Sequence, residues 1–432
     1  MTDIQGNDMT RSKNILASLA LGALSATLAG AGPVTTVPWN GHTGAVSFTY
    51  DDARVSQLPN LIPQLDSLHI KATFEIAALP SLGNFTSRRA DWIQVSRNGH
   101  ELANHTYTHE NVNESNGDSV TKVIKLMADT LRKVDTSIQS VTFAYPNCNL
   151  TANATAKNGL SAENFMARGC GSPTLSWGTQ PSDWMNIAGT ILGPTSASSA
   201  VTSINAAKTN NRWYITIVHD VSDSPPDQYS MTPANNLSML TAAVSAGVWI
   251  DTYSAVGAYY RAHFTLDTAQ AVQNGSFKRL QWVSPHPKMP KRVPLRVKLD
   301  TTVFGDSAVV VQDSVLIPRQ SDGSYVVDFM KLRMDVYPKG TVAVKPSTQF
   351  RKATVNARIT GKVLRLEGLP SGSYLVEIRD TQGRLAERGG ARVSGLQAQE
   401  FTLRGPITSG FYTVTLRHSS GETRRLPVLL SL

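Results

Sequence analysis

The order of hydrophobic and polar positions divides the chain into two parts with different periodicity. Between about residues 40 and 264, short apolar runs typical of buried strands alternate with segments of helical spacing. The strand-like runs are Val46–Tyr50, Ala72–Ile76, Glu101–Asn104, Val141–Ala144, Trp213–Val218 and Val248–Asp251. The helical segments are Leu61–Leu68, Trp92–Asn98, Ser119–Val134 and Leu237–Ala246. Repeated strand-then-helix units predict an α/β domain built on a parallel sheet.

After about residue 265 the helical spacing disappears and period-two alternation takes over. Val293–Leu299, Ser307–Ile317 and Tyr325–Phe329 alternate like strands, and Asp322-Gly323 is a turn signal. We therefore expect a β-rich accessory domain over residues 275–340, followed by a linker at Tyr337–Ala353.

The last part of the chain, residues 354–432, contains a weak internal echo. The segment Ser371–Arg379 recurs as Ser409–Arg417, and a polar turn and a further strand follow each copy. Two copies are too few for a solenoid, so we expect the opposing strands of one small antiparallel β-sandwich.

The clearest chemical signal is a pair of histidines downstream of a pair of acids. His105 and His109 stand four residues apart, a spacing that would place both on one face of a helix or helical turn. Upstream, an apolar strand runs into Asp51 and Asp52. Two histidines and one aspartate, with coordination positions left open, make a hydrolytic metal site. Either feature alone is commonplace, and the combination predicts a metal centre. With such residues at strand C-termini, a barrel is the natural form of the sheet.

This arrangement assigns a role to each group. Asp52, His105 and His109 are the proposed ligands of a divalent metal, which zinc suits best and which cobalt or nickel could replace. Asp51 is the proposed general base, and its alternative role is to hold a backbone amide. His219 follows the apolar strand Trp213–Val218 and is the proposed general acid, with a purely structural histidine as the alternative.

The same residues resemble a known family. The segments Ser47–Ala53 and His105–His109 resemble the first two signature motifs of the NodB-type polysaccharide deacetylases, carbohydrate esterase family 4, and Lys71–Phe74 resembles the second strand of that family. The resemblance covers roughly residues 40–264. It implies an irregular (β/α) barrel of about seven strands and a divalent metal, commonly zinc.

The resemblance also implies roles for residues outside these two motifs. Asp183-Trp184 resembles a motif whose aspartate orients the acid histidine, and Ile217 would line the pocket for the acetyl methyl group. Tyr145 and Trp184 are candidates for stacking on a sugar ring. A backbone amide near Asn147 would stabilise the oxyanion.

One position departs from the family pattern. In the stretch Phe143–Asn147 the strand and the proline match, but Ala144 stands where the family has an arginine that pairs with the catalytic base. The departure leaves the tuning of Asp51 open. Another cation could substitute, and Arg168 is the nearest candidate in sequence.

The two ends of the chain and its cysteines bear on location. Residues 1–31 read as a secretory signal peptide, with a transmembrane anchor as the alternative. Cys148 and Cys170 are the only cysteines, and in an exported protein they form a plausible disulfide; two buried thiols are the alternative.

The positive charge of the chain lies in its C-terminal part. From residue 277 onward about 25 lysines and arginines face about 12 acids, within a net charge of +9. Such a surface suits anionic polysaccharide, cell envelope or secretion machinery, and we expect no nucleic acid. The stretch from Gly410 to Leu430 resembles the sorting domains of type IX-secreted bacterial proteins; an ordinary immunoglobulin-like accessory domain is the alternative.

Two functions follow from this reading. The first is a secreted, metal-dependent polysaccharide deacetylase that removes N-acetyl or O-acetyl groups from chitin, peptidoglycan or xylan. The second is a catalytically impaired carbohydrate-binding or envelope module on the same barrel, for which Ala144 is the best support.

Overall fold

The computed structural model describes residues 32–431 apart from a set of gaps. The gaps are 82, 113–116, 135, 137, 140, 151–152, 173–174, 225–226, 314, 339–355, 361, 370–371, 381–384, 394–398, 404–409 and 420–422. The expected signal peptide and nearly all of the expected linker lie outside the described residues. No helix among the described residues is long and apolar enough to cross a membrane.

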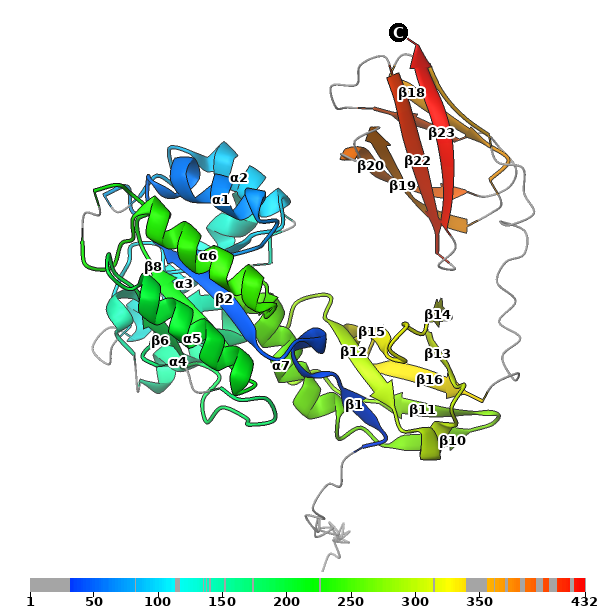
Figure 1. Ribbon diagram of the computed structural model, residues 1–432, viewed down its shortest axis with the longest axis horizontal. Helices are drawn as coiled ribbons and strands as arrows, with labels where there is room; N and C mark the ends of the chain where they lie inside the picture. The colour runs from blue at the N-terminus through cyan, green and yellow to red at the C-terminus, as the bar shows by residue number, and fades with distance from the viewer. Residues whose placement is uncertain are drawn as a thin grey trace, which may run out of the picture. The chain divides into compact units, whose positions relative to one another are not determined.

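Seven parallel strands close into a barrel, as the sequence predicted (Figure 1). The strand order is β3-β4-β5-β6-β7-β8-β2, and a pairing between β2 and β3 closes the ring. The strands are β2 (Ala45–Asp51), β3 (Thr73–Ile76), β4 (Glu101–Asn104), β5 (Thr142–Ala144), β6 (Met166–Cys170), β7 (Ile187–Ile191) and β8 (Trp213–Val218). A short additional strand, β9 (Trp249–Ile250), pairs with β2. Because all these strands run the same way, their C-terminal ends share one rim.

Helices follow most strands and cover the outside of the barrel (Figure 1). They are α1 (Ile62–Ser67), α2 (Arg89–Arg97), α3 (Gly117–Val134), α4 (Ala154–Glu163), α5 (Ala197–Thr209), α6 (Pro233–Ala246) and α7 (Tyr253–Leu266). Helix α6 illustrates how the sequence determines where a helix begins and ends. The Thr232 side chain accepts the N–H of Asn235, a proline occupies the first turn, and Gly247 ends the helix in the left-handed region.

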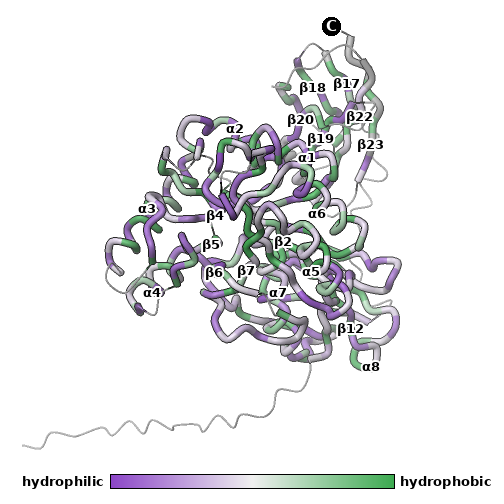
Figure 2. Tube along the Cα trace, turned by 60° about the vertical axis from the view of Figure 1, so that its left-hand side comes forward, coloured by the Kyte–Doolittle hydropathy of each residue, from purple (hydrophilic) through white to green (hydrophobic). Residues whose placement is uncertain are grey.

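The central strands are apolar throughout because both of their faces are covered. Every residue of β2 and of β8 is buried. Along the chain trace, apolar stretches on and around β2 contrast with the mixed polarity of α3 (Figure 2). On β3, Phe74 packs between Tyr50 and Trp92, with ring centroids 5.8 and 5.3 Å away. This aromatic packing lies at the seam where β2 and β3 close the ring.

A β-rich region follows the barrel and shares its apolar core. Its five-stranded sheet has the order β10-β11-β16-β13-β14, and a three-stranded sheet has the order β1-β12-β15. The strands are β1 (Val34–Thr36), β10 (Ala271–Asn274), β11 (Phe277–Gln281), β12 (Pro294–Leu299), β13 (Val309–Gln312), β14 (Val315–Ile317), β15 (Tyr325–Asp328) and β16 (Arg333–Tyr337), with a short helix α8 (Thr301–Phe304). Strand β1 precedes the barrel in sequence but pairs with β12. One core cluster contains both Trp213 of the barrel and Leu295 of this region.

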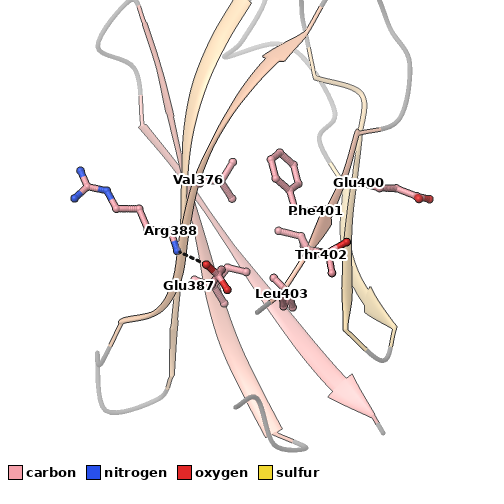
Figure 3. Close-up of a pocket in the computed structure, with 10 residues that line it drawn as sticks. Val376, Glu387, Arg388, Glu400, Phe401, Thr402 and Leu403 are labelled. Atoms are coloured by element: carbon pink, nitrogen blue, oxygen red, sulfur yellow. Dashed lines mark hydrogen bonds between the residues drawn. The ribbon is translucent and has the colours of Figure 1, made fainter. Parts of the chain in front are cut away.

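The C-terminal region is a seven-stranded sheet with the order β20-β19-β22-β23-β17-β18-β21. Its strands are β17 (Asn356–Thr360), β18 (Val363–Glu367), β19 (Gly372–Asp380), β20 (Leu385–Val393), β21 (Gln399–Thr402), β22 (Gly410–His418) and β23 (Thr423–Ser431). The two halves of the sequence echo become neighbouring antiparallel strands, β19 and β22. The echo strands were expected to oppose each other in a sandwich, but they lie side by side in one sheet, because each pairs with the other through backbone hydrogen bonds. The sheet is antiparallel apart from the parallel pair of β17 and β23, and the resemblance to sorting domains stays a prediction. Residues of the edge strands β20 and β21 line a cavity of about 460 Å³ in this sheet (Figure 3).

Truncation of Phe74 tests the importance of the barrel seam. We expect Phe74→Ala to lower the free energy of unfolding by about 3–5 kcal/mol, because it leaves a cavity between Tyr50 and Trp92. Denaturant unfolding measures the change. Val55→Ala, at a side chain that is 64% exposed, is the control and should change the stability by less than about 0.5 kcal/mol. Equal effects of the two substitutions would contradict this account of the seam.

Candidate metal centre and active site

The two acids lie where β2 leaves the barrel. Asp51 is the last residue of β2, and Asp52 adopts a left-handed conformation with φ of 73°. The Asp52 N–H donates to the carbonyl oxygen of Glu75 at 2.9 Å, which fixes this turn against β3. Both side chains are buried, at 4% and 1% exposure. The turn therefore directs both carboxylates to the same rim of the barrel, although alternate strand residues normally face opposite ways.

The two histidines lie on a loop after β4, and the helical interpretation of their spacing is wrong. Thr106 and His109 both have positive φ, 60° and 57°, which a right-handed helix does not allow. The loop is held by side chains: Asn104 Oδ1 accepts the Thr106 N–H, and the Thr106 hydroxyl oxygen accepts the Glu110 N–H. This tight loop brings the rings of His105 and His109 to a centroid distance of 4.9 Å.

Asp52, His105 and His109 form a group that could hold a metal ion, with their ligand atoms within 4.8 Å of one another. Asp52 Oδ1 lies 3.3 Å from His109 Nε2 and 3.6 Å from His105 Nε2. This buried oxygen has no hydrogen-bond partner among the described residues. The opposite nitrogen of His105, Nδ1, lies 2.9 Å from the carbonyl oxygen of Ala144, so it carries the proton and leaves the Nε2 lone pair for a ligand role. The donor set and its orphaned oxygen fit a divalent metal.

The surroundings keep the donors in the protonation state that a metal requires. Burial lowers the pKa of His105 to about 4, although the carboxylates of Asp51 and Asp52 act the other way. Burial also lowers the pKa of His109. Both imidazoles are therefore neutral at pH 7. Arg54 Nη2 contacts the second oxygen of Asp52 at 2.9 Å, which leaves Oδ1 facing the histidines. Arg54 was not among the residues predicted from the sequence, although its place shortly after the acids was a signal.

Arg168 on β6 pairs with Asp51. Its Nη2 donates to both carboxylate oxygens, at 2.6 and 2.8 Å, and both side chains are buried. Residues Ala144 and Arg168 are register partners on the adjacent parallel strands β5 and β6. A guanidinium from either position can therefore approach the same carboxylate. Arg168 on β6 therefore supplies the positive charge that an arginine at position 144 would otherwise provide.

The electrostatics of this pair favour ionised Asp51. Burial by itself would raise the pKa of Asp51, but the charge and hydrogen bonds of the Arg168 guanidinium outweigh it, and the pKa lies below its ordinary value. Behind the pair, Glu75 Oε1 lies 3.6 Å from Arg168 Nε. Burial raises the pKa of Glu75 well above its usual range, which favours the neutral form of this carboxyl beside the guanidinium that binds Asp51. Glu75 was also missed, and its signal was an acid inside the apolar run of β3.

His219 follows β8 and joins the metal residues at the rim. Its Nε2 lies 3.8 Å from Asp52 Oδ2, and its ring lies 5.4 Å from the ring of Tyr229. Its Nδ1 is buried without a hydrogen-bond partner in the described part of the chain. The histidine therefore has a position for proton transfer at the rim but no carboxylate bonded to its far nitrogen.

The structure does not bring Asp183 and Trp184 to this site. The carboxylate of Asp183 accepts bonds from Lys157 Nζ at 3.1 Å and from the N–H of Met185 at 2.8 Å. It therefore holds the turn before β7 rather than His219. Trp184 packs against Tyr260, outside the pocket residues. The motif resemblance failed here because two residues cannot specify the direction of a loop.

A pocket of about 150 Å³ opens over the metal residues. It is lined by Asp51, His105, His109, Tyr145, Asn147, Cys148, Cys170, Ile191, Ile217, His219 and Tyr229. Of the predicted pocket residues, Tyr145 and Ile217 are present and Trp184 is not, and Asn147, predicted near the oxyanion, also lines the pocket. The Tyr145 hydroxyl donates to the carbonyl oxygen of Met185 at 2.8 Å, which fixes its ring.

The predicted disulfide between Cys148 and Cys170 is formed and is part of the pocket wall. It ties the turn after β5 to the end of β6. Asn147 and Cys148 are consecutive left-handed residues, with φ of 54° and 57°. The Asn147 side chain also donates to Asn111 Oδ1 at 2.8 Å, on the loop that carries the histidines. The backbone near the expected oxyanion position is therefore anchored on two sides.

Removal of one imidazole tests the metal triad. Loss of a residue that only hydrogen-bonds to a metal ligand typically weakens metal binding about 10- to 100-fold. We expect His105→Ala to weaken zinc binding by more than this, because a direct ligand is lost. Calorimetric titration of metal-free protein with zinc measures the affinity. The exposed His42 offers a control, and His42→Ala should bind zinc like the unchanged protein. Unchanged affinity and stoichiometry in His105→Ala would contradict the triad.

Part of the chain is similar to known proteins. Residues 40–162 match the family model of polysaccharide deacetylase. No curated protein matches the chain. A solved family 4 acetyl xylan esterase from Clostridium thermocellum, in complex with a cobalt ion, is 21% identical and aligns over 49% of this chain and 89% of its own, with a TM-score of 0.34.

Two further solved structures are similar over about half of the chain. A putative polysaccharide deacetylase from Mycobacterium smegmatis is 17% identical and covers 54% of this chain and 96% of its own, with a TM-score of 0.39. A family 4 pseudoenzyme from Bacillus anthracis is 14% identical over 50% of this chain and 66% of its own, with a TM-score of 0.36. The residues that match the family model of polysaccharide deacetylase include both acids and both histidines of the rim.

Proposed function

We propose that the barrel removes acetyl groups from a glycan by metal-dependent hydrolysis. The observation that carries this proposal is the buried Asp51 carboxylate, bound by Arg168 and placed beside the triad of Asp52, His105 and His109. A general base next to a site for a divalent ion is the arrangement that metal-assisted hydrolysis requires.

Each residue has a role that follows from its position. A divalent ion held by the triad would supply positive charge that acidifies water and polarises a carbonyl oxygen. Asp51, whose pKa is lowered, is ionised at neutral pH and accepts the proton of the attacking water. His219, on the same rim, donates a proton to the departing amine or alcohol. The N–H at Asn147 is the proposed donor to the oxyanion.

The pocket suits a small acyl group. Ile191, Ile217 and the disulfide-bonded Cys148 and Cys170 line it beside the metal residues. The proposed substrates are N-acetylated glycans such as chitin and peptidoglycan, or O-acetylated glycans such as xylan. The proposed metal is zinc, with cobalt or nickel as functional substitutes, and the structural relative from C. thermocellum carries cobalt.

We further propose that the protein is exported and acts outside the cell or at its surface. The sequence of residues 1–31 and the disulfide support this location, because disulfides persist in oxidising compartments. The basic C-terminal part would then face anionic cell-envelope material or secretion machinery.

A catalytically impaired barrel that binds glycan is the second candidate. It is favoured by the buried His219 Nδ1, which no described carboxylate contacts, and a pseudoenzyme is among the structural relatives. Its original support, the alanine at position 144, is weakened because Arg168 reaches Asp51 from the adjacent strand.

Acetate release decides between the two candidates. We expect the purified chain to release acetate from at least one of chito-oligosaccharide, peptidoglycan and acetyl-xylan when zinc is present. Chelator should abolish the release, because the triad would lose the ion. Binding of zinc without acetate release from any substrate would overturn the enzyme and support the binding barrel.

Exchange of the guanidinium between strands tests the role of Arg168. In Arg168→Met the pKa of Asp51 should rise, because its main attractive charge is lost. The acid limb of the pH profile of kcat/KM should then move to higher pH, by about 1–3 units. Adding Ala144→Arg to this variant should move the limb back, since positions 144 and 168 are register partners.

Two controls separate this effect from a loss of fold. Arg89→Met, at an exposed side chain, should leave the pH profile unchanged. Circular dichroism checks that Arg168→Met is folded, because an unpaired buried carboxylate destabilises a protein by several kcal/mol, roughly 3–5. An acid limb at the same pH in folded Arg168→Met would contradict the proposed tuning of Asp51.

A further inference from the structure

The side chain of Gln57 bridges the two strand ends that carry the proposed base and the proposed acid. Gln57 begins a π-helical turn, Gln57–Leu61, which leads from the end of β2 into α1. Its amide nitrogen Nε2 donates to the carbonyl oxygen of Asp51 and to that of His219, both at 2.8 Å. The residue is fully buried. Both N–H groups of one amide therefore bind the backbone of these two residues.

This bridge extends the pairing of β2 with β8 by one residue. The parallel ladder between the two strands ends at the pair of Tyr50 and Val218. Asp51 and His219 are the next residues along each strand, and their carbonyl oxygens meet at the Gln57 amide. The reverse orientation of the amide would place its oxygen against two carbonyl oxygens, so the nitrogen must face them.

Neighbouring side chains tie the same two segments together further along. The Ser56 hydroxyl donates to Asp220 Oδ1 at 2.6 Å and accepts the N–H of Val221 at 3.0 Å. Asn60 Nδ2 donates to the carbonyl oxygen of Val221 at 2.7 Å. These bonds hold the residues that follow the proposed acid, whereas Gln57 binds the backbone of the acid itself.

The two ends of the bridge differ in what else holds their side chains. Arg168 binds both oxygens of the Asp51 carboxylate. The imidazole of His219 has no comparable anchor, because its Nδ1 lacks a hydrogen-bond partner in the described part of the chain. The backbone of His219 donates its N–H to the carbonyl oxygen of Tyr229 and offers its own carbonyl oxygen to Gln57. The position of this ring therefore depends on the backbone that Gln57 helps to fix.

We propose that Gln57 is a positioning residue that holds the proton donor His219 in place relative to Asp51. The inference rests on the proposed function, because it uses the proton transfer assigned there to His219. When the bond from the acetyl carbon to nitrogen or oxygen breaks, the departing atom keeps the electron pair and takes the proton of the imidazolium.

Such a transfer depends strongly on distance. The two heavy atoms must lie within hydrogen-bond reach, about 2.6–3.2 Å. A displacement of about 1 Å can cost about 100-fold in rate. Loss of the bridge should therefore slow the reaction without removing any group that touches the substrate.

A double-mutant cycle tests whether Gln57 acts through His219. Gln57→Met keeps the length of the side chain and removes both N–H donors. On the glycan that releases most acetate, we expect kcat to fall about 10- to 100-fold with KM unchanged, because the proton donor is misplaced while the substrate contacts remain. In a His219→Ala background the same substitution should have no further effect on kcat, since no donor is left to position. An equal loss in both backgrounds would overturn the inference.

Gln64→Met is the matched control for the loss of a side-chain amide. Gln64 Nε2 donates to the carbonyl oxygen of Pro233 at 2.9 Å, and Gln64 does not line the active-site pocket. Loss of that bond should lower the stability of the protein and leave kcat unchanged. A fall in kcat as large as that of Gln57→Met would also overturn the inference, because a general loss of stability would then explain both.

Exchange of backbone amide hydrogens gives a readout that needs no activity. In Gln57→Met the amides of His219 and Asp220 should exchange about tenfold faster, because one hydrogen bond that holds this segment is lost. Gln64→Met should leave their exchange unchanged. Faster exchange in a chain that releases no acetate would overturn the enzyme but support the positioning by Gln57. Unchanged exchange and unchanged kcat in an active chain would overturn the positioning alone, and unchanged exchange in an inactive chain would overturn both.

Discussion

One buried ion pair, between Asp51 and Arg168, links the stability of the barrel to its chemistry. Asp51 is buried at the C-terminal end of β2. Burial alone favours the neutral form of a carboxyl group, so a nearby cation is needed to keep it ionised. Arg168 supplies that cation from β6. Glu75 lies beside the same guanidinium, and burial raises the pKa of its carboxyl well above the usual range. The other carboxylate of the rim, Asp52, contacts Arg54 with one oxygen and faces the histidines with the other.

The sequence predicted those parts of the barrel in which local pattern and buried environment agree. The strands β2 and β8 are apolar along their whole length because both faces are covered, so continuous hydrophobic runs identified them. Strand β6 escaped prediction because it contains Arg168 and Gly169, which interrupt an apolar run. Arg168 interrupts the run because it pairs with Asp51, which lies far away in sequence. The local pattern of residues cannot reveal that a buried charge has a distant partner.

The site shows the same division between local and distant information. Asp52, His105 and His109 were identified by residue type and spacing, and the structure brings them together. Their geometry was not predictable, because left-handed residues at Thr106 and His109 replace the helical turn that the spacing suggested. Asp183 lies beside Lys157 because the loop that carries it turns toward α4. A short segment can reveal a motif by its residue types, but it does not reveal the course of the loop that carries the motif.

The pairing of positions 144 and 168 has a consequence for how inactive members of such a family are recognised. A survey that reads each motif position separately would record this chain as defective at its arginine. A survey that reads side chains by their spatial neighbours would find the guanidinium one strand further along. In a parallel barrel, register partners on adjacent strands can both reach the same carboxylate. An essential arginine can therefore be replaced by one on the neighbouring strand, while the carboxylate that it pairs with keeps its position.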